Sequence, residues 1–105
     1  MKMRFQRVKA PLGFAVAMKI IINDEVIYKL KNGEVFEYEA DNVKSILIKT
    51  HRFINDLVIP VEDLKDSTDI LLQYQYGICK NSTQAIVSGN GQLIGIYPQR
   101  IKVNK

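Results

Sequence analysis

The chain has 105 residues, of which 47% are hydrophobic and 25% are charged, and its formal net charge is +4. This length fits one domain that buries a core without metal or disulfide support, and the composition excludes a disordered chain. The single cysteine, Cys79, excludes an internal disulfide, so we expect a soluble protein that folds in the cytoplasm.

Short runs of alternating apolar and polar residues, bounded by turn residues, recur along nearly the whole chain. Five Tyr and four Phe, together with many Ile and Val, favour strands because such side chains pack well on a half-buried pleated surface. The predicted strands cover residues 2–8, 15–22, 25–31, 34–40, 43–50, 56–61, 69–76, 84–88 and 92–97.

The strand centres lie roughly ten residues apart, a spacing that is typical of sandwiches and barrels and leaves no room for helical crossovers. The sequence therefore predicts one all-β domain over residues 1–105. Its predicted architecture is an antiparallel β-sandwich, Ig-like or related, of about seven to nine short strands. A small β-barrel is the alternative.

The clearest predicted hairpin joins residues 25–31 to residues 34–40. Alternation places Tyr28 and Phe36 on the inward faces of these strands, and an even-numbered loop would set inward side chains opposite outward ones. The three-residue loop Lys31-Asn32-Gly33 removes this conflict, with its glycine in the left-handed conformation. It predicts that Tyr28 pairs with Phe36.

Two further turns follow from the same pattern. Matching of inward faces predicts another odd-numbered loop, Asn23-Asp24-Glu25, so that three consecutive strands form an antiparallel meander. Farther along, Ser88-Gly89-Asn90-Gly91 predicts a hairpin turn. This glycine-rich segment superficially resembles a dinucleotide-binding loop, but such a loop needs a following helix, and residues 92–97 have the pattern of a strand.

Basic residues gather near both ends of the sequence and would form one basic region if the ends are neighbours in the fold. Tyr97, beside Pro98, is the aromatic ring that we expect to be exposed next to them. This region is the candidate interaction surface, for a protein or for nucleic acid. Its predicted members are Lys2, Arg4, Arg7, Lys9, Tyr97, Arg100 and Lys102.

The sequence offers little support for catalysis or for a metal site. A Cys79–His51 pair is the one nucleophile and base that the chain could bring together, and one Cys with one His cannot form a structural zinc site. An acidic cluster offers oxygen ligands but lacks the spacing of a calcium loop. Its members are Glu62, Asp63, Asp66 and Asp69. We therefore predict no catalytic, cofactor-binding or metal-binding residues, and no cofactor.

The longest apolar stretch, residues 12–22, contains Lys19 and is shorter than the roughly 20 residues that a membrane span needs. We expect no transmembrane helix. The small residues Ala15-Val16-Ala17 imitate the cleavage site of a secretion signal, although the apolar region before them is short. Secretion is therefore the alternative to the cytoplasm.

The segment from Met18 to Leu47 contains Ile-Ile-Ile-Asn-Asp-Glu-Val-Ile and Leu-Lys-Asn-Gly-Glu, and Ser-Ile-Leu-Ile follows at its end. This strand–turn–strand pattern, which covers under a third of the chain, resembles small PEGA-like bacterial β-sandwich modules. Ala40-Asp41-Asn42-Val43 stands where that family would have a glycine turn. The resemblance implies a non-catalytic accessory or interaction module, with no catalytic residues to carry over.

The leading functional prediction is a non-catalytic binding or structural module that contacts another protein. Nucleic-acid binding through the basic termini is one alternative, and a small-ligand-binding or enzymatic domain with a cavity between its sheets is another. An exposed edge strand would also allow two copies to join by sheet extension, but the sequence does not identify that strand.

Overall fold

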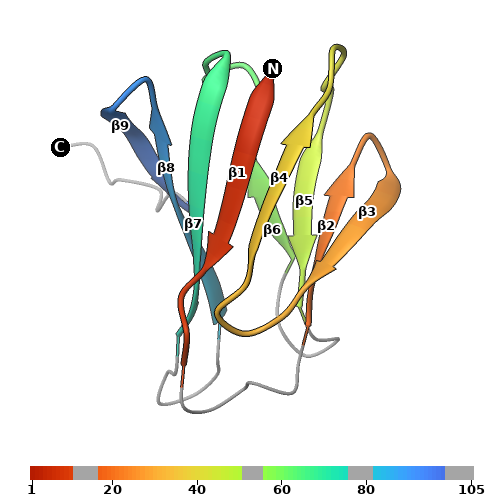
Figure 1. Cartoon of the computed structure of the whole chain (residues 1–105), viewed down its shortest axis with the longest axis vertical. Coiled ribbons are helices and arrows are strands. Elements are labelled where there is room, and N and C mark those ends of the chain that lie inside the picture. The colour runs from red at the N-terminus through yellow and green to blue at the C-terminus, as the bar shows by residue number, and fades with distance from the viewer. Residues whose placement is uncertain (11–16, 51–55, 76–81, 99–105) are drawn as a thin grey trace, which may run out of the picture.

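The computed structural model describes residues 1–10, 17–50, 56–75 and 82–98. Every predicted strand is found at its predicted place, with ends that differ by a few residues. The strands are β1 (Lys2–Arg7), β2 (Met18–Ile22), β3 (Glu25–Leu30), β4 (Val35–Glu39), β5 (Ile46–Lys49), β6 (Leu57–Ile59), β7 (Ser67–Gln75), β8 (Ser82–Gly89) and β9 (Gln92–Tyr97) (Figure 1). The described residues contain no helix with the length and apolar character needed to cross a membrane.

The strands form two sheets that pack against each other, with the orders β4-β1-β7-β8-β9 and β3-β2-β5-β6 (Figure 1). Each sheet, as far as the structure describes it, ends in two edge strands, so the predicted sandwich is confirmed and the barrel alternative is wrong. One pair departs from the predicted antiparallel pattern, because β1 and β7 are parallel. Parallel neighbours need a long crossover, and here the chain between them builds β4 and the whole second sheet.

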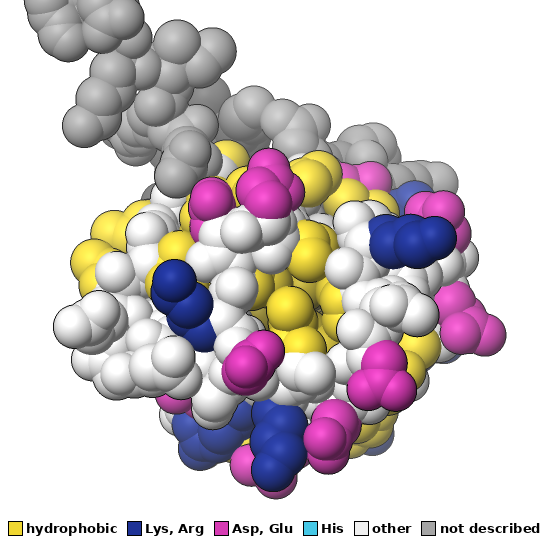
Figure 2. Space-filling view, turned by 90° about the horizontal axis from the view of Figure 1, so that it is seen from above, with side chains coloured by type: hydrophobic (Ala, Val, Ile, Leu, Met, Phe, Trp, Pro, Cys, Tyr) yellow, Lys and Arg dark blue, Asp and Glu magenta, His cyan; other side chains and the backbone are white. Residues whose placement is uncertain are grey.

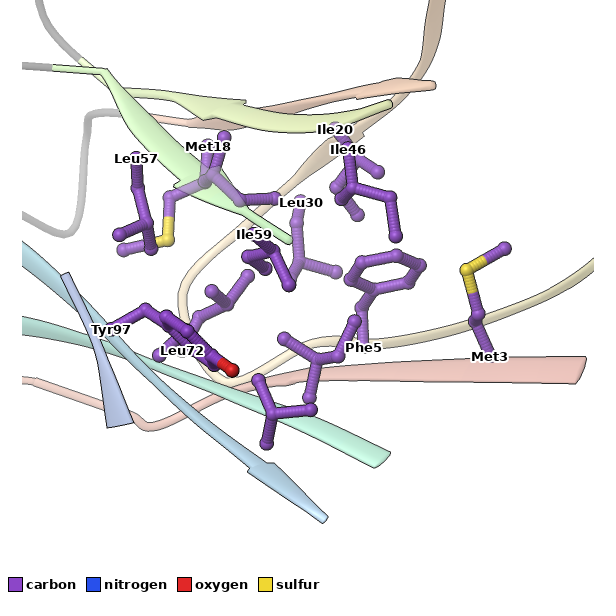
Figure 3. Packing of buried hydrophobic residues seen from close by; sticks show 14 of the residues in the cluster. Met3, Phe5, Met18, Ile20, Leu30, Ile46, Leu57, Ile59, Leu72 and Tyr97 are labelled. Atoms are coloured by element: carbon purple, nitrogen blue, oxygen red, sulfur yellow. The ribbon is translucent and has the colours of Figure 1, made fainter. Parts of the chain in front are cut away.

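Alternation along the strands sends one set of side chains between the sheets and the other set outward. Burial alternates without interruption along β8, for example. Figure 3 shows side chains from both sheets meeting between them, among them the ring of Phe5. The buried apolar residues are Met3, Phe5, Met18, Ile20, Ile22, Leu30, Ile46, Ile48, Leu57, Ile59, Ile70, Leu72, Ala85, Val87 and Tyr97.

The predicted pairing of β3 with β4 is wrong, because the two strands belong to different sheets. The predicted left-handed conformation of Gly33 is confirmed by its φ of 75°, but the connection spans residues 31–34 and is not a three-residue hairpin loop. The Glu34 N–H donates a 3.0 Å hydrogen bond to the Lys31 carbonyl. Tyr28 and Phe36 do meet, as nearly parallel rings 4.1 Å apart, but they stack between the sheets instead of pairing in a ladder. β4 pairs with β1, which has the same alternation of inward and outward residues.

β2 and β3 form the expected hairpin, but with a different turn from the predicted one. Their loop has two residues, Asn23 and Asp24, whose φ angles of 53° and 64° are typical of a type I′ turn. A β-bulge removes the conflict between faces, since Ile20 lies opposite Tyr28 whereas Ile21 lies opposite Val26. The predicted odd-numbered loop and the three-stranded meander are therefore wrong. The matching of inward faces is confirmed for Met18 with Leu30 and for Ile20 with Tyr28, but it fails beyond the bulge, where buried Ile22 lies opposite exposed Glu25.

This turn gives a prediction for stability. Asp24 holds a left-handed conformation that costs a non-glycine residue about 1–2 kcal/mol, and Gly91 occupies the equivalent position in the turn between β8 and β9. We expect Asp24→Gly to raise the free energy of unfolding by up to about 1 kcal/mol, and Gly91→Ala to lower it by a similar amount. Urea denaturation measures both, and unchanged midpoints would contradict the prediction.

β8 and β9 form the predicted antiparallel hairpin around Asn90 and Gly91. Both turn residues have positive φ angles, of 52° and 81°. Because β9 begins directly after Gly91, as the sequence predicts, this segment has no helix N-terminus to hold a phosphate.

The core reaches the surface at the end of the sandwich where the N-terminus lies. Figure 2 shows apolar side chains in the centre of this end, surrounded by polar and charged ones. The partly buried hydrophobic residues of the N-terminus and of the connections at this end pack against the core. They are Met1, Val43, Val61 and Leu64.

Candidate interaction surface

Lys2 and Arg4 lie on the outward face of β1, and carboxylates flank them. Glu39 and Glu37 of β4 lie opposite Lys2 and Arg4, and Asp69 of β7 lies opposite Arg4 on the other side. The Arg4 Nε is 3.9 Å from a carboxylate oxygen of Glu37. An open groove of about 510 Å³ runs over these residues. Three carboxylates beside two cations make this a surface of mixed charge, so β1 does not present a basic one.

Two other predicted members of the basic region lie inside the sandwich. Arg7 is 2% exposed, and its Nη1 donates a 2.9 Å hydrogen bond to the Leu30 carbonyl. Tyr97 is also 2% exposed, so the prediction that its ring is exposed is wrong. Burial raises the pKa of the Tyr97 hydroxyl, and the negative charges of Asp63 and Glu62 act in the same direction.

The strands nearest the two ends of the chain are not neighbours, because β7 and β8 lie between β1 and β9 (Figure 1). Lys9 is exposed just beyond β1, beside the turn at Gly33. Arg100 and Lys102 lie outside the described residues. The structure thus does not bring the described members of the predicted region together at one surface.

The four edge strands differ in how well they can accept another strand. β6 has three residues and is followed by Pro60. The ladders of β3 and β9 are each interrupted by a register shift. β4 is regular over five residues, with uninterrupted pairs to β1. Among the described strands, β4 is therefore the edge most open to sheet extension.

The backbone of β4 alternates between bonds to β1 and groups that face the open edge. The Ala40 N–H donates to the Met1 carbonyl, and the Arg7 N–H donates to the Glu34 carbonyl. In this antiparallel register the even-numbered residues of β4 make the hydrogen bonds to β1. The N–H and C=O groups of the odd-numbered residues consequently point away from the sheet. These residues are Val35, Glu37 and Glu39.

Aromatic rings lie on the inner side of this edge. Phe36 and Tyr38 are half-buried on β4 with ring centroids 6.0 Å apart, and Tyr28 of β3 stacks on Phe36. The Tyr28 hydroxyl donates a 2.6 Å hydrogen bond to Glu34, whose other carboxylate oxygen accepts a 2.8 Å bond from the Lys31 N–H. These bonds hold the connection at which the chain passes from the second sheet to the first.

The Tyr28–Glu34 pair predicts a pH dependence of stability. The hydrogen bond from Tyr28, together with that from the Lys31 N–H, lowers the pKa of Glu34. A carboxyl whose pKa is lower in the folded state stabilises the fold above its unfolded pKa, and this contribution disappears as the pH falls through the folded pKa. We expect the wild type to lose more stability than Glu34→Gln between about pH 5 and pH 3.

Tyr28→Phe is the second variant for this prediction, because it removes the main cause of the lowered pKa of Glu34 but keeps the carboxyl. Between pH 5 and pH 3, its loss of the free energy of unfolding should fall between the losses of the wild type and of Glu34→Gln. Urea unfolding at each pH measures these losses. The pKa of Tyr28 is raised by the same hydrogen bond, so its contribution is present below about pH 10 and is lost as the pH rises further. Equal losses of stability on acidification in all three proteins would contradict the prediction.

The outer face of the second sheet carries a row of lysines that the sequence analysis missed. Lys19 of β2 lies directly opposite both Lys29 of β3 and Lys49 of β5, and all three are exposed. Like charges at directly opposed positions destabilise a sheet. The alternation of each strand places its lysine outward, but only the pairing of the strands brings the three together.

An apolar row lies on the outer face of the first sheet, away from β4. Leu71, Ile86 and Ile96 lie opposite one another across β7, β8 and β9. Ile96 is 45% exposed, and Leu93, farther along β9, is 64% exposed. This row gives the first sheet an apolar side and a charged side.

The described residues do not assemble a metal site. Among them, no three His, Cys, Asp or Glu residues lie close enough together to hold a metal ion. His51 and Cys79 lie outside the described residues, so their pairing stays a prediction. The features that stand out are surfaces: the open edge of β4, the lysine row and the apolar row.

These surfaces belong to a two-sheet β-sandwich with one regular open edge. No family model matches the chain, and no curated protein or solved structure matches it either. The resemblance of residues 18–47 to PEGA-like modules stays a prediction.

Proposed function

We propose that this domain is a non-catalytic module that binds another protein chain, which adds to the first sheet as an extended strand along β4. The regular free edge of β4 carries this proposal. Its outward N–H and C=O groups, on three alternate residues, are the groups that an added strand would pair with. Of the other three edges, β6 is short and β3 and β9 are bulged, which disfavours the same contact there.

The side chains of β4 define which strand would fit. Glu37 and Glu39 are exposed on the outer face, whereas Phe36 and Tyr38 are half-buried on the inner face. Residues directly opposite each other in a sheet point to the same face, so basic residues of the partner would meet the glutamates and apolar residues would cover the rings. The preferred partner is therefore an extended segment in which Lys or Arg alternates with apolar residues.

A display library of random heptapeptides, selected on the immobilised full chain, tests this proposal. We expect the enriched peptides to show the basic–apolar alternation and to lose about tenfold or more in affinity on Glu37→Pro. That substitution removes one outward N–H but no hydrogen bond to β1, so its thermal unfolding should resemble that of the wild type. Enriched peptides that bind Glu37→Pro as tightly as the wild type would overturn the proposal.

Nucleic-acid binding is the second candidate function, and the lysine row supports it in place of the termini. Lys19, Lys29 and Lys49 repel one another in the free protein, and a polyanion would relieve that repulsion. We expect retention of a single-stranded oligonucleotide at low salt in a filter assay, and its loss in Lys19→Glu. Lys44→Glu, an exposed lysine outside the row, is the matched control, and equal losses in both variants would count against a specific surface.

A further inference from the structure

Residues 100–105 repeat the side-chain pattern of β1. The sequence of β1 is Lys2-Met3-Arg4-Phe5-Gln6-Arg7, and the later sequence is Arg100-Ile101-Lys102-Val103-Asn104-Lys105. Each basic residue of one segment corresponds to a basic residue of the other, each apolar residue to an apolar one, and Gln to Asn. β1 is the strand that already occupies one side of β4.

The side chains of β4 complement this pattern on its paired side. Lys2 and Arg4 lie opposite Glu39 and Glu37, and Met3 lies opposite Tyr38. An antiparallel strand on the open side of β4 would meet the same glutamates and the same inner face. It would form its hydrogen bonds with the outward groups of the odd-numbered residues, which the ladder with β1 does not use.

β4 has no strand of its own sheet on its second side, and its inner face is incompletely covered. Phe36 and Tyr38 are both only half-buried. Apolar side chains of an added strand would therefore cover ring surface that the free domain leaves exposed.

We propose that residues 100–105 of one molecule bind as an antiparallel strand along β4 of a second copy of this chain. In this register Arg100 lies opposite Glu39, Lys102 opposite Glu37 and Asn104 opposite Val35. Ile101 and Val103 then cover the rings on the inner face. This inference rests on the proposed function, because it uses the same edge and names the chain that occupies it.

The same molecule cannot supply this strand. β9 and β4 are at opposite edges of a five-stranded sheet, so four strand spacings of about 4.8 Å separate them by about 19 Å. Arg100 is two residues beyond Pro98, a reach of about 7 Å. β9 also ends level with Arg7, at the end of the sheet away from Glu39. The segment must therefore come from another copy.

Sedimentation velocity of the full chain over a range of concentrations tests the proposal. We expect the wild type to self-associate, and we expect association to weaken about tenfold or more in Glu37→Lys, in Lys102→Glu and in a chain that ends at Pro98. Asp69→Lys is the matched control: it makes the same charge change in the same row beside Arg4, but on β7, away from the edge. It should associate like the wild type.

The register is tested by exchanging the two charges. Glu37→Lys combined with Lys102→Glu restores an opposite-charge pair at the proposed contact, so the double variant should associate more strongly than either single variant. Thermal unfolding of each protein shows that the domain is folded. Failure of the rescue, equal weakening by Asp69→Lys, or a wild type that stays monomeric would overturn the inference.

The two proposals fail in different ways. If library peptides bind at β4 while the full chain stays monomeric and a synthetic peptide of residues 99–105 does not bind, then strand addition stands but this occupant is wrong. If neither the library peptides nor the synthetic peptide depend on β4, both proposals fail.

Discussion

Phe5→Ala should lower the free energy of unfolding by about 3–5 kcal/mol, as large a stability loss as we expect from any single truncation in this chain. The Phe5 side chain is completely buried on β1, between the two sheets (Figure 3). Its ring also packs near Phe36, with ring centroids 6.4 Å apart. Truncation removes this apolar surface and leaves a cavity, because β1 is held on both sides by β4 and β7 and cannot move inward freely.

Equilibrium denaturation in guanidinium chloride measures this loss. Leu93→Ala is the control, because Leu93 is 64% exposed and its truncation should change stability by no more than about 0.5 kcal/mol. Equal effects of the two substitutions would show that Phe5 is not part of the core between the two sheets.

Substitution of Tyr97 should give the second large change in the free energy of unfolding, and the sign of this change depends on the residue introduced. Its ring is buried and lies against Gly95, where an added Cβ would be 2.9 Å from the Tyr97 hydroxyl. That hydroxyl is buried and has no hydrogen-bond partner among the described residues. Tyr97→Phe should therefore raise the free energy of unfolding by about 1 kcal/mol, because it removes a desolvated polar group and keeps the ring. Tyr97→Ala should lower it by about 3–5 kcal/mol.

Thermal and chemical denaturation of the wild type and the two variants check this pair. Destabilisation by Tyr97→Phe would show that the hydroxyl makes a favourable interaction in the folded state. A small effect of Tyr97→Ala would show that the ring is not part of the core.

The strands could be predicted from the sequence because their signal is local. Side chains on a strand alternate between two faces, so an alternating run such as Leu72-Gln73-Tyr74 or the turn at Asn90 and Gly91 identifies its own conformation. Gly33 is also left-handed as predicted, since that conformation depends on a few neighbouring residues.

Partner choice could not be predicted in the same way. The alternation of inward and outward residues in β4 is compatible with pairing to either β1 or β3. Only the whole structure shows that β4 pairs with β1, where Lys2 and Arg4 lie opposite its glutamates. A hairpin with β3 would have joined neighbouring segments, whereas the observed pairing links residues from 29 positions apart, Gln6 and Val35, to 37 positions apart, Lys2 and Glu39. The bulge between β2 and β3 was missed because an odd-numbered loop satisfies the same face matching.

The charged surfaces also depend on which strands are neighbours, which the sequence did not predict. Charge along the sequence suggested a basic region at the termini, yet the alternation of β1 that buries Met3 and Phe5 also turns Arg7 inward. Lys19, Lys29 and Lys49 are distant in the sequence and become a row only through strand pairing.

The sequence by itself determined that this protein is an all-β domain, where its strands lie and where its turns fall, because backbone conformation and side-chain alternation are properties of short segments. Only the tertiary structure decided which strands are neighbours, which charges face each other and that β4 is the open edge. Those features depend on contacts between distant residues, and many pairings satisfy the same local pattern.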